Sequence, residues 1–344
     1  MKKLVLLTWL LAAAVLICEA QNRSIHFEAT KEWKKIISKA KKEKKLIFID
    51  CYTSWCGPCK MLANKIFTQN AVADFFNKNF VNVKYDMEKD TDGVTLKKKF
   101  NVKAFPTLVF VDPVTQEAVH CIVGARQAEE LIAEGKKAQD PENNLNGMMK
   151  RYAAGERSAE FLTAYMPTLA SAYMQQEVSK VTVEYLNTLP AEQLVTQENW
   201  ALINQYVSDP LSAPLKQVMA NRKKFYRIAS KNAVDDKLAY CIHAAVGQLV
   251  DWNPETNAIF DEKRNKALTD YLQHIDFFPV VPTSLANLYT AAYVRKKDFR
   301  GLLDKMKEVL SYNMFQSIVS KGRYFQRNIE ALTQCEDKKL VEEG

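Results

Sequence analysis

The alternation of apolar and polar residues divides the chain into two parts of different character. Up to about residue 140, short apolar or alternating runs, which are typical of strands, follow one another with stretches of helical spacing between them. Beyond residue 140, apolar residues recur at helical spacing and no strand pattern competes. We therefore predict an α/β unit over residues 21–140 and an all-α unit over residues 141–344.

The first part is predicted to form a mixed central sheet with helices on both faces. Strands are expected at residues 24–29, 45–50, 80–86, 107–112 and 118–124. Helices are expected at residues 31–44 after an N-cap at Thr30, from about Cys56 to Phe67, at 71–79, at 92–100 and at 127–138. Strands that alternate with helices predict parallel pairs, and the last two strands, joined by a turn, predict an antiparallel hairpin.

The second part is predicted to be an array of stacked helices. It begins after residues 140–147, DPENNLNG, whose Asn, Pro and Gly content is typical of a linker or turn. No cluster of catalytic residue types is visible in residues 141–344. Because helical arrays often bind other proteins along a concave face, we hypothesise that this part docks a partner or substrate protein.

Residues 1–20 have the pattern of a secretory signal peptide. Two lysines at positions 2 and 3 precede a run of 15 residues that ends at Cys18 and is apolar except for Thr8, and the small residue Ala20 follows. The run is shorter than the roughly 20 residues that a membrane-spanning helix needs. We expect cleavage after Ala20 and export to the periplasm or cell envelope as a soluble protein, in a compartment where disulfides persist. A lipoprotein signal at Cys18 ranks below simple export, because the preceding Ile17 is large.

The net charge of +8 belongs mainly to the first part. Residues 21–140 hold 21 Lys and Arg against 15 Asp and Glu, whereas residues 141–344 hold 25 against 24. The basic stretch at residues 34–45 is interpreted as the solvated face of an amphipathic helix. Nucleic-acid binding is therefore not expected, all the more since an exported protein has little access to nucleic acid.

The chemistry centres on residues 47–62, IFIDCYTSWCGPCKML, where two residues separate Cys56 from Cys59. A zinc site usually needs four ligands, and one such pair with four histidines that form no HxxxH pair does not supply them. A disulfide that closes so short a loop removes little chain entropy, so a purely structural role is also disfavoured. A redox role remains as the best explanation of the spacing.

A redox role also fits the local structure that the sequence predicts. The strand ends near Asp50 and a helix begins around Cys56, which places that sulfur near unpaired backbone N–H groups and the positive end of the helix dipole. The thiolate is the form that this position stabilises. Cys59, one helical turn further on, is expected to be more buried. Pro58 removes an N–H that would be unpaired near a helix start, and Gly57 lets a partner disulfide approach the backbone.

Four separated features then resemble the thioredoxin family. WCGPCK, residues 55–60, is the family's active-site hexapeptide, and Asp50 stands where thioredoxins keep a buried carboxylate. VKAFPTLVF, residues 102–110, resembles the segment with the family's cis-proline, here Pro106. IVGA, residues 122–125, resembles the last strand and its glycine. The resemblance covers residues 22–140 and implies a thioredoxin-like fold followed by the helical array.

The resemblance also implies roles for the site residues. Cys56 would attack a substrate disulfide, Cys59 would resolve the mixed disulfide, and Asp50 would exchange the proton of Cys59 with a pKa raised by burial. Pro106 and Phe105 would flank the disulfide and offer backbone groups to an extended substrate.

Trp55 would help to shape the exposed face around the disulfide. This chain departs from the family at Phe105, which is bulkier than the usual aliphatic residue or threonine. The lysine that thioredoxins often keep near the carboxylate has no clear counterpart, since Lys84 is expected to lie out of register. The additional Cys51 and Cys121 are interpreted as small buried apolar residues.

These features predict an exported thiol–disulfide oxidoreductase that reduces protein disulfides. Its expected substrates are protein disulfides or thiols, and its expected electron donor is a membrane-bound reductase. No cofactor beyond the Cys56–Cys59 disulfide and no metal is expected. The alternatives are a disulfide oxidant or isomerase, or a helical-array binding protein in which the thioredoxin-like domain is accessory. The intact cysteine motif, Asp50 and Pro106 argue against a pure scaffold.

Overall fold

The computed structural model describes residues 23–250, 261–312, 314–315 and 317–343. The predicted signal peptide lies outside the described residues. The chain divides into two compact units, Met1–Val178 and Ser179–Gly344. Within the described ranges, no helix combines the length and the apolar character that a membrane span requires.

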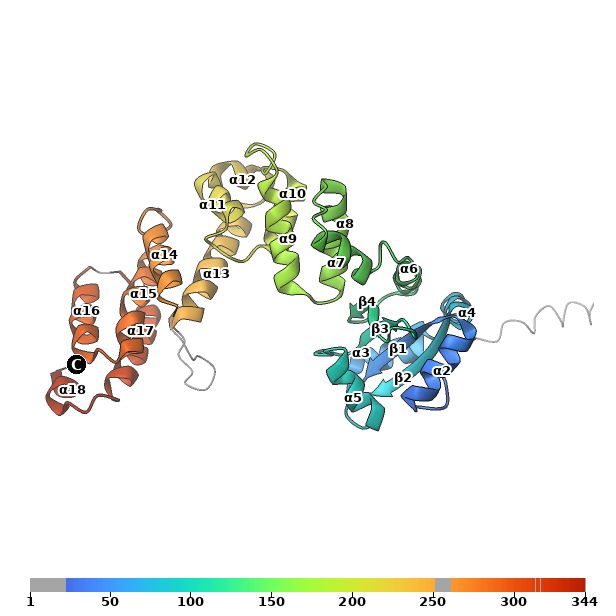
Figure 1. Cartoon of the computed structure of the whole chain (residues 1–344). Coiled ribbons are helices and arrows are strands. Elements are labelled where there is room, and N and C mark those ends of the chain that lie inside the picture. The colour runs from blue at the N-terminus through green and yellow to red at the C-terminus, as the bar shows by residue number, and fades with distance from the viewer. Residues whose placement is uncertain (1–22, 251–260, 313, 316, 344) are drawn as a thin grey trace, which may run out of the picture. The chain divides into compact units, whose positions relative to one another are not determined.

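The first unit is built on a sheet of four strands in the order β2-β1-β3-β4 (Figure 1), and the sheet is mixed, as the sequence predicts. The strands are β1 Leu46–Tyr52, β2 Phe80–Asp86, β3 Thr107–Val111 and β4 Ala118–Val123. β1 pairs in parallel with β2 and antiparallel with β3, and β3 pairs antiparallel with β4. The apolar strand β1 lies inside the sheet, which explains why its residues are buried on both faces.

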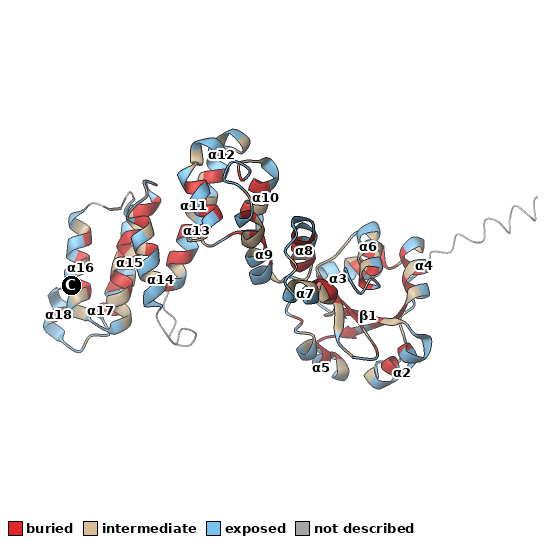
Figure 2. Cartoon of the chain, turned by 45° about the horizontal axis from the view of Figure 1, so that its top comes forward, coloured by how far each residue is buried: buried red, intermediate tan, exposed pale blue. Residues whose placement is uncertain are grey.

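Helices cover both faces of this sheet. They are α2 Trp33–Glu43, α3 Gly57–Met61, the π-helix η1 Leu62–Ile66, α4 Asn70–Asn79, α5 Thr91–Lys99 and α6 Ala128–Ala138. Alternate residues of β1 point to opposite cores: Ile47 and Ile49 pack with α2 and α5, whereas Phe48 packs with η1, α4 and α6. Figure 2 shows β1 buried between these helices.

The strand expected at residues 24–29 is absent. This segment has no regular secondary structure, and its backbone bonds reach two different parts of the unit: Ile25 N donates to Phe67 O (2.8 Å) and Glu28 N to Asn82 O (2.8 Å). The backbone N–H of His26 donates to Oδ1 of Asn77 (2.7 Å). Because the bonds are shared among several partners, no ladder forms, and the sheet has one strand fewer than predicted.

The first helix also begins later than expected. Its N-cap is Glu32 rather than Thr30; the Glu32 side chain does not cap the helix, and Asp92 accepts instead from Trp33 N (2.7 Å). The hydroxyl of Thr30 instead accepts a hydrogen bond from Glu32 N (3.2 Å). The threonine therefore stabilises the turn that leads into the helix rather than its first exposed N–H groups.

The boundary between the units lies after Val178, later than the predicted boundary at residue 140. Two helices after α6, α7 Leu145–Ala153 and α8 Ala159–Ser171, pack against β4 and belong to the first unit. The predicted linker is a tight turn in which Asn144 caps α7 by accepting from Gly147 N (2.9 Å).

A buried histidine joins these helices to the sheet. His120 of β4 is fully buried; its Nε2 bonds Glu134 of α6 (2.8 Å), and its Nδ1 accepts from Leu145 N at the start of α7 (3.2 Å). Glu134 also accepts from Ser171 at the end of α8 (3.4 Å), and Lys137 of α6 donates to Thr168 of α8. These polar contacts, invisible in the sequence pattern, extend the first unit past residue 140.

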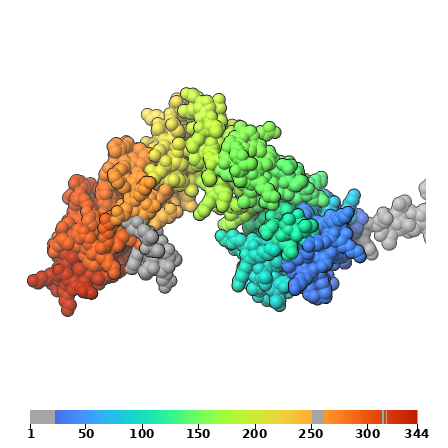
Figure 3. Space-filling view, viewed as in Figure 1, coloured from blue at the N-terminus to red at the C-terminus, as the bar shows by residue number. Residues whose placement is uncertain are grey.

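The second unit is helical throughout its described residues. After α9 Gln175–Asn187, which spans the boundary, it contains α10 Gln197–Tyr206, α11 Ala213–Ala220, α12 Arg222–Ile228, α13 Lys231–Val250, α14 Glu262–Leu272, α15 Val280–Lys296, α16 Phe299–Ser311, α17 Ile318–Leu332 and α18 Lys338–Glu343. Neighbours in the sequence lie side by side within this unit, so adjacent colours border each other in Figure 3. α15 is its central element and contacts α13, α14, α16 and α17. The predicted helical array is confirmed.

Candidate active site

The two cysteines of the motif lie where β1 gives way to α3. The turn between these elements is closed by a hydrogen bond from Cys56 N to Thr53 O (3.2 Å). Cys56 has an extended backbone and is the N-cap residue, and Pro58 lies in the first helical turn, where no partner for its missing N–H is needed. The helix start that the sequence predicts around Cys56 is confirmed.

Cys56 and Cys59 form a disulfide with a Cα–Cα distance of 5.4 Å. The Cys56 sulfur caps the helix, because it accepts a hydrogen bond from Cys59 N (3.1 Å). That bond would strengthen if the sulfur carried a negative charge, as a thiolate does. The expectation that Cys59 is the more buried thiol is wrong for this oxidised form, since Cys56 is 3% exposed and Cys59 is 5% exposed.

Asp50 is a buried carboxylate in the middle of the sheet. It is 4% exposed, and its Oδ1 has no hydrogen-bond partner among the described residues. Burial raises the pKa of Asp50 to about 7, and the positive charge of Lys84 opposes part of that rise. The carboxyl group can therefore both hold and release a proton near neutral pH.

The prediction that Lys84 lies out of register is wrong. In the parallel pair of β1 and β2, Asp50 is the direct partner of Lys84. β1 begins at Leu46, one residue later than predicted, whereas β2 begins at Phe80 as predicted. A slip of one residue moves a side chain to the other face of a strand, so strand bounds accurate to one residue do not determine which side chains pair. The Lys84 side chain is exposed, with its ammonium 5.3 Å from the Phe27 ring centre.

The loop before β3 approaches the disulfide motif through an aromatic contact. The peptide bond between Phe105 and Pro106 is cis, as the resemblance implied. Pro106 is buried, and its carbonyl oxygen accepts a hydrogen bond from Gly124 N (2.8 Å). Gly124 has φ +91°, a conformation that glycine adopts readily.

Trp55 and Phe105 form the aromatic part of the surface around the disulfide. Their ring centres are 6.0 Å apart in an edge-to-face arrangement, and Trp55 is 65% exposed. The indole N–H of Trp55 donates to Glu88 (2.9 Å), and the ammonium of Lys97 lies 5.2 Å from the Phe105 ring centre. Sequence reasoning missed Glu88 and Lys97, because no motif marks them and only the fold brings them to this surface.

The additional cysteines have a different environment from the motif. Cys51 lies within β1 and Cys121 within β4, and the intervening β3 separates the two strands. Burial raises the pKa of both thiols, that of Cys121 to about 12. Thiols that resist ionisation are poor nucleophiles, which agrees with their interpretation as small apolar residues.

Metal binding is the alternative role for cysteines with this spacing. Among the residues that the structure describes, no three His, Cys, Asp or Glu side chains are grouped so that they could hold an ion. The described geometry of Cys56 and Cys59 suits thiol–disulfide exchange, in which the sulfurs react with one another and with a substrate.

Comparison with known proteins gives a consistent family. The Thioredoxin family model matches residues 24–137. Thioredoxin H2 of Arabidopsis thaliana is 35% identical over 109 residues, which cover 31% of this chain and 74% of the relative. Thioredoxin H3 of the same plant is 31% identical over 118 residues, which cover 34% of this chain and 92% of the relative.

Similar solved structures cover the same share of the chain. The solution structure of a candidate disulphide-isomerase from Bacteroides thetaiotaomicron is 43% identical, covers 35% of this chain and 96% of its own, and has a TM-score of 0.32. The solution structure of a thioredoxin from Thermus thermophilus is 16% identical, covers 39% of this chain and 99% of its own, and has a TM-score of 0.33.

Proposed function

From the premise that the chain belongs to the thioredoxin family and is a thiol–disulfide oxidoreductase, we propose that it is exported and reduces the disulfides of other proteins. The observation that carries the proposal is the Cys56–Cys59 disulfide at a helix start, in the same fold as a buried carboxylate whose pKa is about 7.

The first chemical step uses Cys56 as the nucleophile. In the reduced protein its thiolate attacks one sulfur of a substrate disulfide, and a mixed disulfide forms while the other substrate sulfur leaves as a thiolate that takes up a proton. The N-cap position supports this role, because the Cys59 N–H points at the Cys56 sulfur and stabilises its negative charge.

The second step uses Cys59 and Asp50. Cys59 loses its proton and attacks the Cys56 sulfur, which breaks the mixed disulfide, restores the Cys56–Cys59 bond and releases the second substrate thiol. Asp50 accepts that proton, directly or through water. A carboxyl group with a pKa of about 7 suits this exchange, because it is a stronger base than an exposed aspartate and still ionises near neutral pH.

The substrate would bind along Trp55, Gly57 and the Phe105–Pro106 loop. A Cβ added to Gly57 would meet no atom within 4 Å, so its surface is open to an approaching peptide. The Pro106 carbonyl already accepts from Gly124, so Phe105 is the residue of this loop that we assign to main-chain pairing with an extended substrate. Its ring, larger than the residue usual in the family, would favour substrates with an apolar side chain beside the disulfide.

The reductive direction rests on the Gly57–Pro58 pair, which resembles that of reducing thioredoxins. Such proteins have potentials of about −270 mV, against about −120 mV for a strong periplasmic oxidant. A reductase outside the cytoplasm needs a supply of electrons, and a membrane-bound reductase is the donor that we assign to it. An isomerase would start from the same reduced cysteine pair.

Export is supported by the sequence of residues 1–20. Cell fractionation and N-terminal sequencing of the mature protein test it directly. A mature chain that begins at residue 21 in the envelope fraction supports export, whereas a chain that keeps residues 1–20 in the cytoplasmic fraction contradicts it.

The equilibrium reduction potential of Cys56–Cys59 tests the direction of the reaction. It is measured on residues 21–344 in thiol–disulfide buffers of graded composition. A value near about −270 mV supports a reductase, and one near about −120 mV identifies an oxidant instead. Failure of the pair to form a disulfide would favour the alternative in which the helical array is the functional part and the first unit a scaffold.

A further inference from the structure

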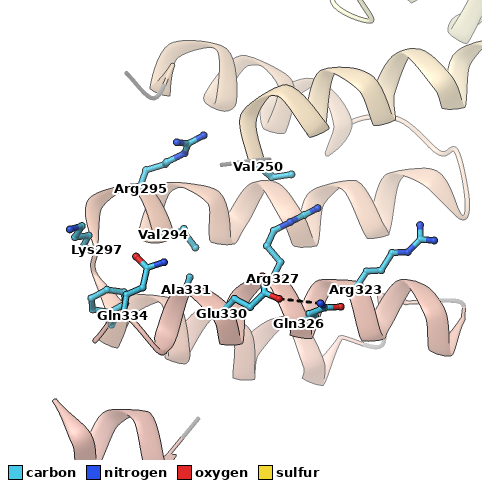
Figure 4. A pocket seen from close by; sticks show the side chains of 11 residues that line it. Val250, Val294, Arg295, Lys297, Arg323, Gln326, Arg327, Glu330, Ala331 and Gln334 are labelled. Atoms are coloured by element: carbon cyan, nitrogen blue, oxygen red, sulfur yellow. Dashed lines mark hydrogen bonds between the residues drawn. The ribbon is translucent and has the colours of Figure 1, made fainter. Parts of the chain in front are cut away.

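The second unit contains a pocket with an unusual concentration of arginine. Its volume is about 560 Å³, which lies in the range of ligand-binding sites. Its walls come from the end of α13, the end of α15, the start of α16 and one face of α17. The lining residues are Val250, Val294, Arg295, Lys297, Phe299, Arg323, Gln326, Arg327, Glu330, Ala331 and Gln334 (Figure 4).

The positive charges come from two opposing elements. Arg295 and Lys297 lie at the end of α15, and Arg323 and Arg327 are four residues apart on α17, so they share one helix face. Figure 4 shows the side chains of Arg323 and Arg327 leaving α17 on the same side. Glu330 is the single acid among the lining residues, and it accepts a hydrogen bond from Gln326 (3.1 Å). The pocket is therefore strongly cationic.

Two of these arginines have no partner within the described part of the chain. Arg295 is half-buried, and burial lowers the pKa of its guanidinium, yet no carboxylate lies within ion-pair distance of it among the described residues. Arg323 is exposed and likewise makes no described ion pair or hydrogen bond. Arg327 donates to the neutral side-chain oxygen of Asn287 (2.7 Å). An arginine cannot discard its charge, so a half-buried one favours an anion beside it.

A structural explanation accounts for only part of this cluster. Cations near the end of a helix interact favourably with its dipole, which suits Arg295 and Lys297. Arg323 and Arg327 lie inside α17, where the dipole has little effect. Arg300 of the same unit, by contrast, has an acidic partner in Glu343 (2.8 Å). Arg295 and Arg323, which have no described acidic partner, thus line the same pocket, although residues 141–344 are nearly neutral as a whole.

The remaining lining residues indicate the kind of anion. Val250, Val294, Phe299 and Ala331 give the pocket apolar surface between its charges. Inorganic phosphate would leave that surface uncovered, whereas a peptide with alternating acidic and apolar side chains would cover it and place carboxylates on the arginines. A guanidinium binds a carboxylate through two parallel hydrogen bonds.

We propose that this pocket binds an acidic peptide segment of a partner protein, with carboxylates on Arg295 and Arg323 and apolar side chains against Val294 and Phe299. The binding does not involve Cys56 and goes beyond the redox function. A partner held in this way is attached to the chain that carries the cysteine pair, which raises its effective concentration for exchange relative to free solution.

Fluorescence anisotropy of the full mature chain with a labelled peptide of alternating glutamate and leucine tests the proposal. A peptide with glutamine in place of glutamate is the matched probe. The glutamate peptide is expected to bind, more weakly as salt rises, and the glutamine peptide to bind at least about tenfold less tightly. Equal binding of the two peptides would overturn the proposal. So would competition by inorganic phosphate at concentrations where sulfate does not compete, since that would identify a phosphate site.

Variants connect the binding to the pocket. Arg295→Gln and Arg323→Gln are each expected to weaken glutamate-peptide binding about tenfold, because each removes a charge-assisted pair. Arg323→Lys keeps the charge but loses the bidentate hydrogen bonding of a guanidinium. Its affinity for the glutamate peptide is expected to lie between that of the glutamine variants and that of the unchanged chain. Lys321→Gln, on the same helix but outside the pocket, is the control. Equal losses in Lys321→Gln and Arg323→Gln would show general charge attraction and contradict the assignment. Cys56→Ser should bind the peptide as the unchanged chain does. Failure of the peptide-binding proposal can therefore be distinguished from failure of the proposed redox function.

Discussion

Asp50 in the first unit and Arg295 in the second are both ionisable groups placed where water cannot fully solvate them. Burial raises the pKa of Asp50 to about 7 and lowers the pKa of Arg295. In both cases the charged form is disfavoured, but the two groups respond differently. A carboxyl group near neutral pH can neutralise itself by taking up a proton, whereas a guanidinium cannot give one up.

This difference shows how the same physical cost supports two kinds of function. In the proposed function, the first unit uses its desolvated group to exchange a proton with Cys59, and no bound ion is required. The second unit keeps a permanent charge on Arg295 that has no described ion-pair partner and that, in our proposal, a peptide carboxylate compensates.

Replacement of the nucleophile gives the largest contrast between the units. Cys56→Ser is expected to reduce the dithiothreitol-driven reduction of insulin disulfides to the background rate, because no described thiol elsewhere caps a helix. Glutamate-peptide binding should not change. The control is Cys51→Ala, which removes a buried thiol of raised pKa and should retain turnover. Turnover that survives in Cys56→Ser would refute the assigned nucleophile.

Removal of the titrating group should slow the resolving step. Asp50→Asn is expected to lower turnover near neutral pH about 100-fold, the usual contribution of a general base. Rapid-quench trapping should show accumulation of the mixed disulfide, because attack by Cys59 becomes slow while attack by Cys56 is retained. An unchanged resolution rate would mean that the proton of Cys59 leaves by another route.

The same substitution should increase stability in a pH-dependent way. The pKa of Asp50 is about 7 in the folded chain, whereas the ordinary pKa of an aspartate is 3.8. Between these values the folded chain holds a proton that the unfolded chain has lost, so the contribution of Asp50 to stability is fully present below about pH 4 and is lost as the pH rises through about 7. Asp50→Asn should therefore raise the free energy of opening at about pH 8 by at most roughly 4 kcal/mol.

Hydrogen exchange of β1 peptides measures this effect without assuming that the two units unfold together. The comparison of Asp50→Asn with the unchanged chain at about pH 4 is the internal control, where the difference should be small. The stated sign would be contradicted if Asp50→Asn protected β1 from exchange more than the unchanged chain does at low pH, and by a smaller margin at high pH.

Removal of the neighbouring cation tests the register of β1 and β2. Lys84→Met should raise the pKa that controls turnover, because Lys84 lowers the pKa of Asp50. The shift is expected to be below about one pH unit, since the lysine is exposed and solvent screens it. The pH–rate profile measures it, and Lys78→Met on α4 is the matched control. A shift of equal size in both variants would indicate a general charge effect.

The smallest predicted effect concerns the cost of the half-buried arginine. Arg295→Met should raise the free energy of local opening of α15 by about 0.5 kcal/mol while it weakens peptide binding. Arg300→Met, which loses an ion pair with Glu343, should not stabilise its helix. Hydrogen exchange of peptides from α15 and α16 compares them. Loss of stability in Arg295→Met would show that contacts within the chain already stabilise the arginine, and would contradict the proposal that a bound anion compensates its charge.

Part of the candidate site could be predicted because its parts are local. The spacing of Cys56 and Cys59 predicted a helix start, and the apolar residues around Asp50 predicted its burial and the direction of its pKa shift. The cis peptide before Pro106 followed from the resemblance. The irregular segment at residues 24–29 could not be told from a strand, because alternation reports exposure and not which groups accept hydrogen bonds from the backbone N–H groups.

The sequence by itself determined the order of strands and helices, the redox motif and the change to an all-α part, because periodicity and capping act between residues that are close along the chain. Only the tertiary structure decided which Lys faces Asp50, how His120 holds α7 to the sheet, and that Arg295 and Arg323 share one pocket. These are meetings of distant residues, and they depend on strand register and helix packing. A one-residue slip or a small rotation changes them while the hydrophobic pattern stays the same.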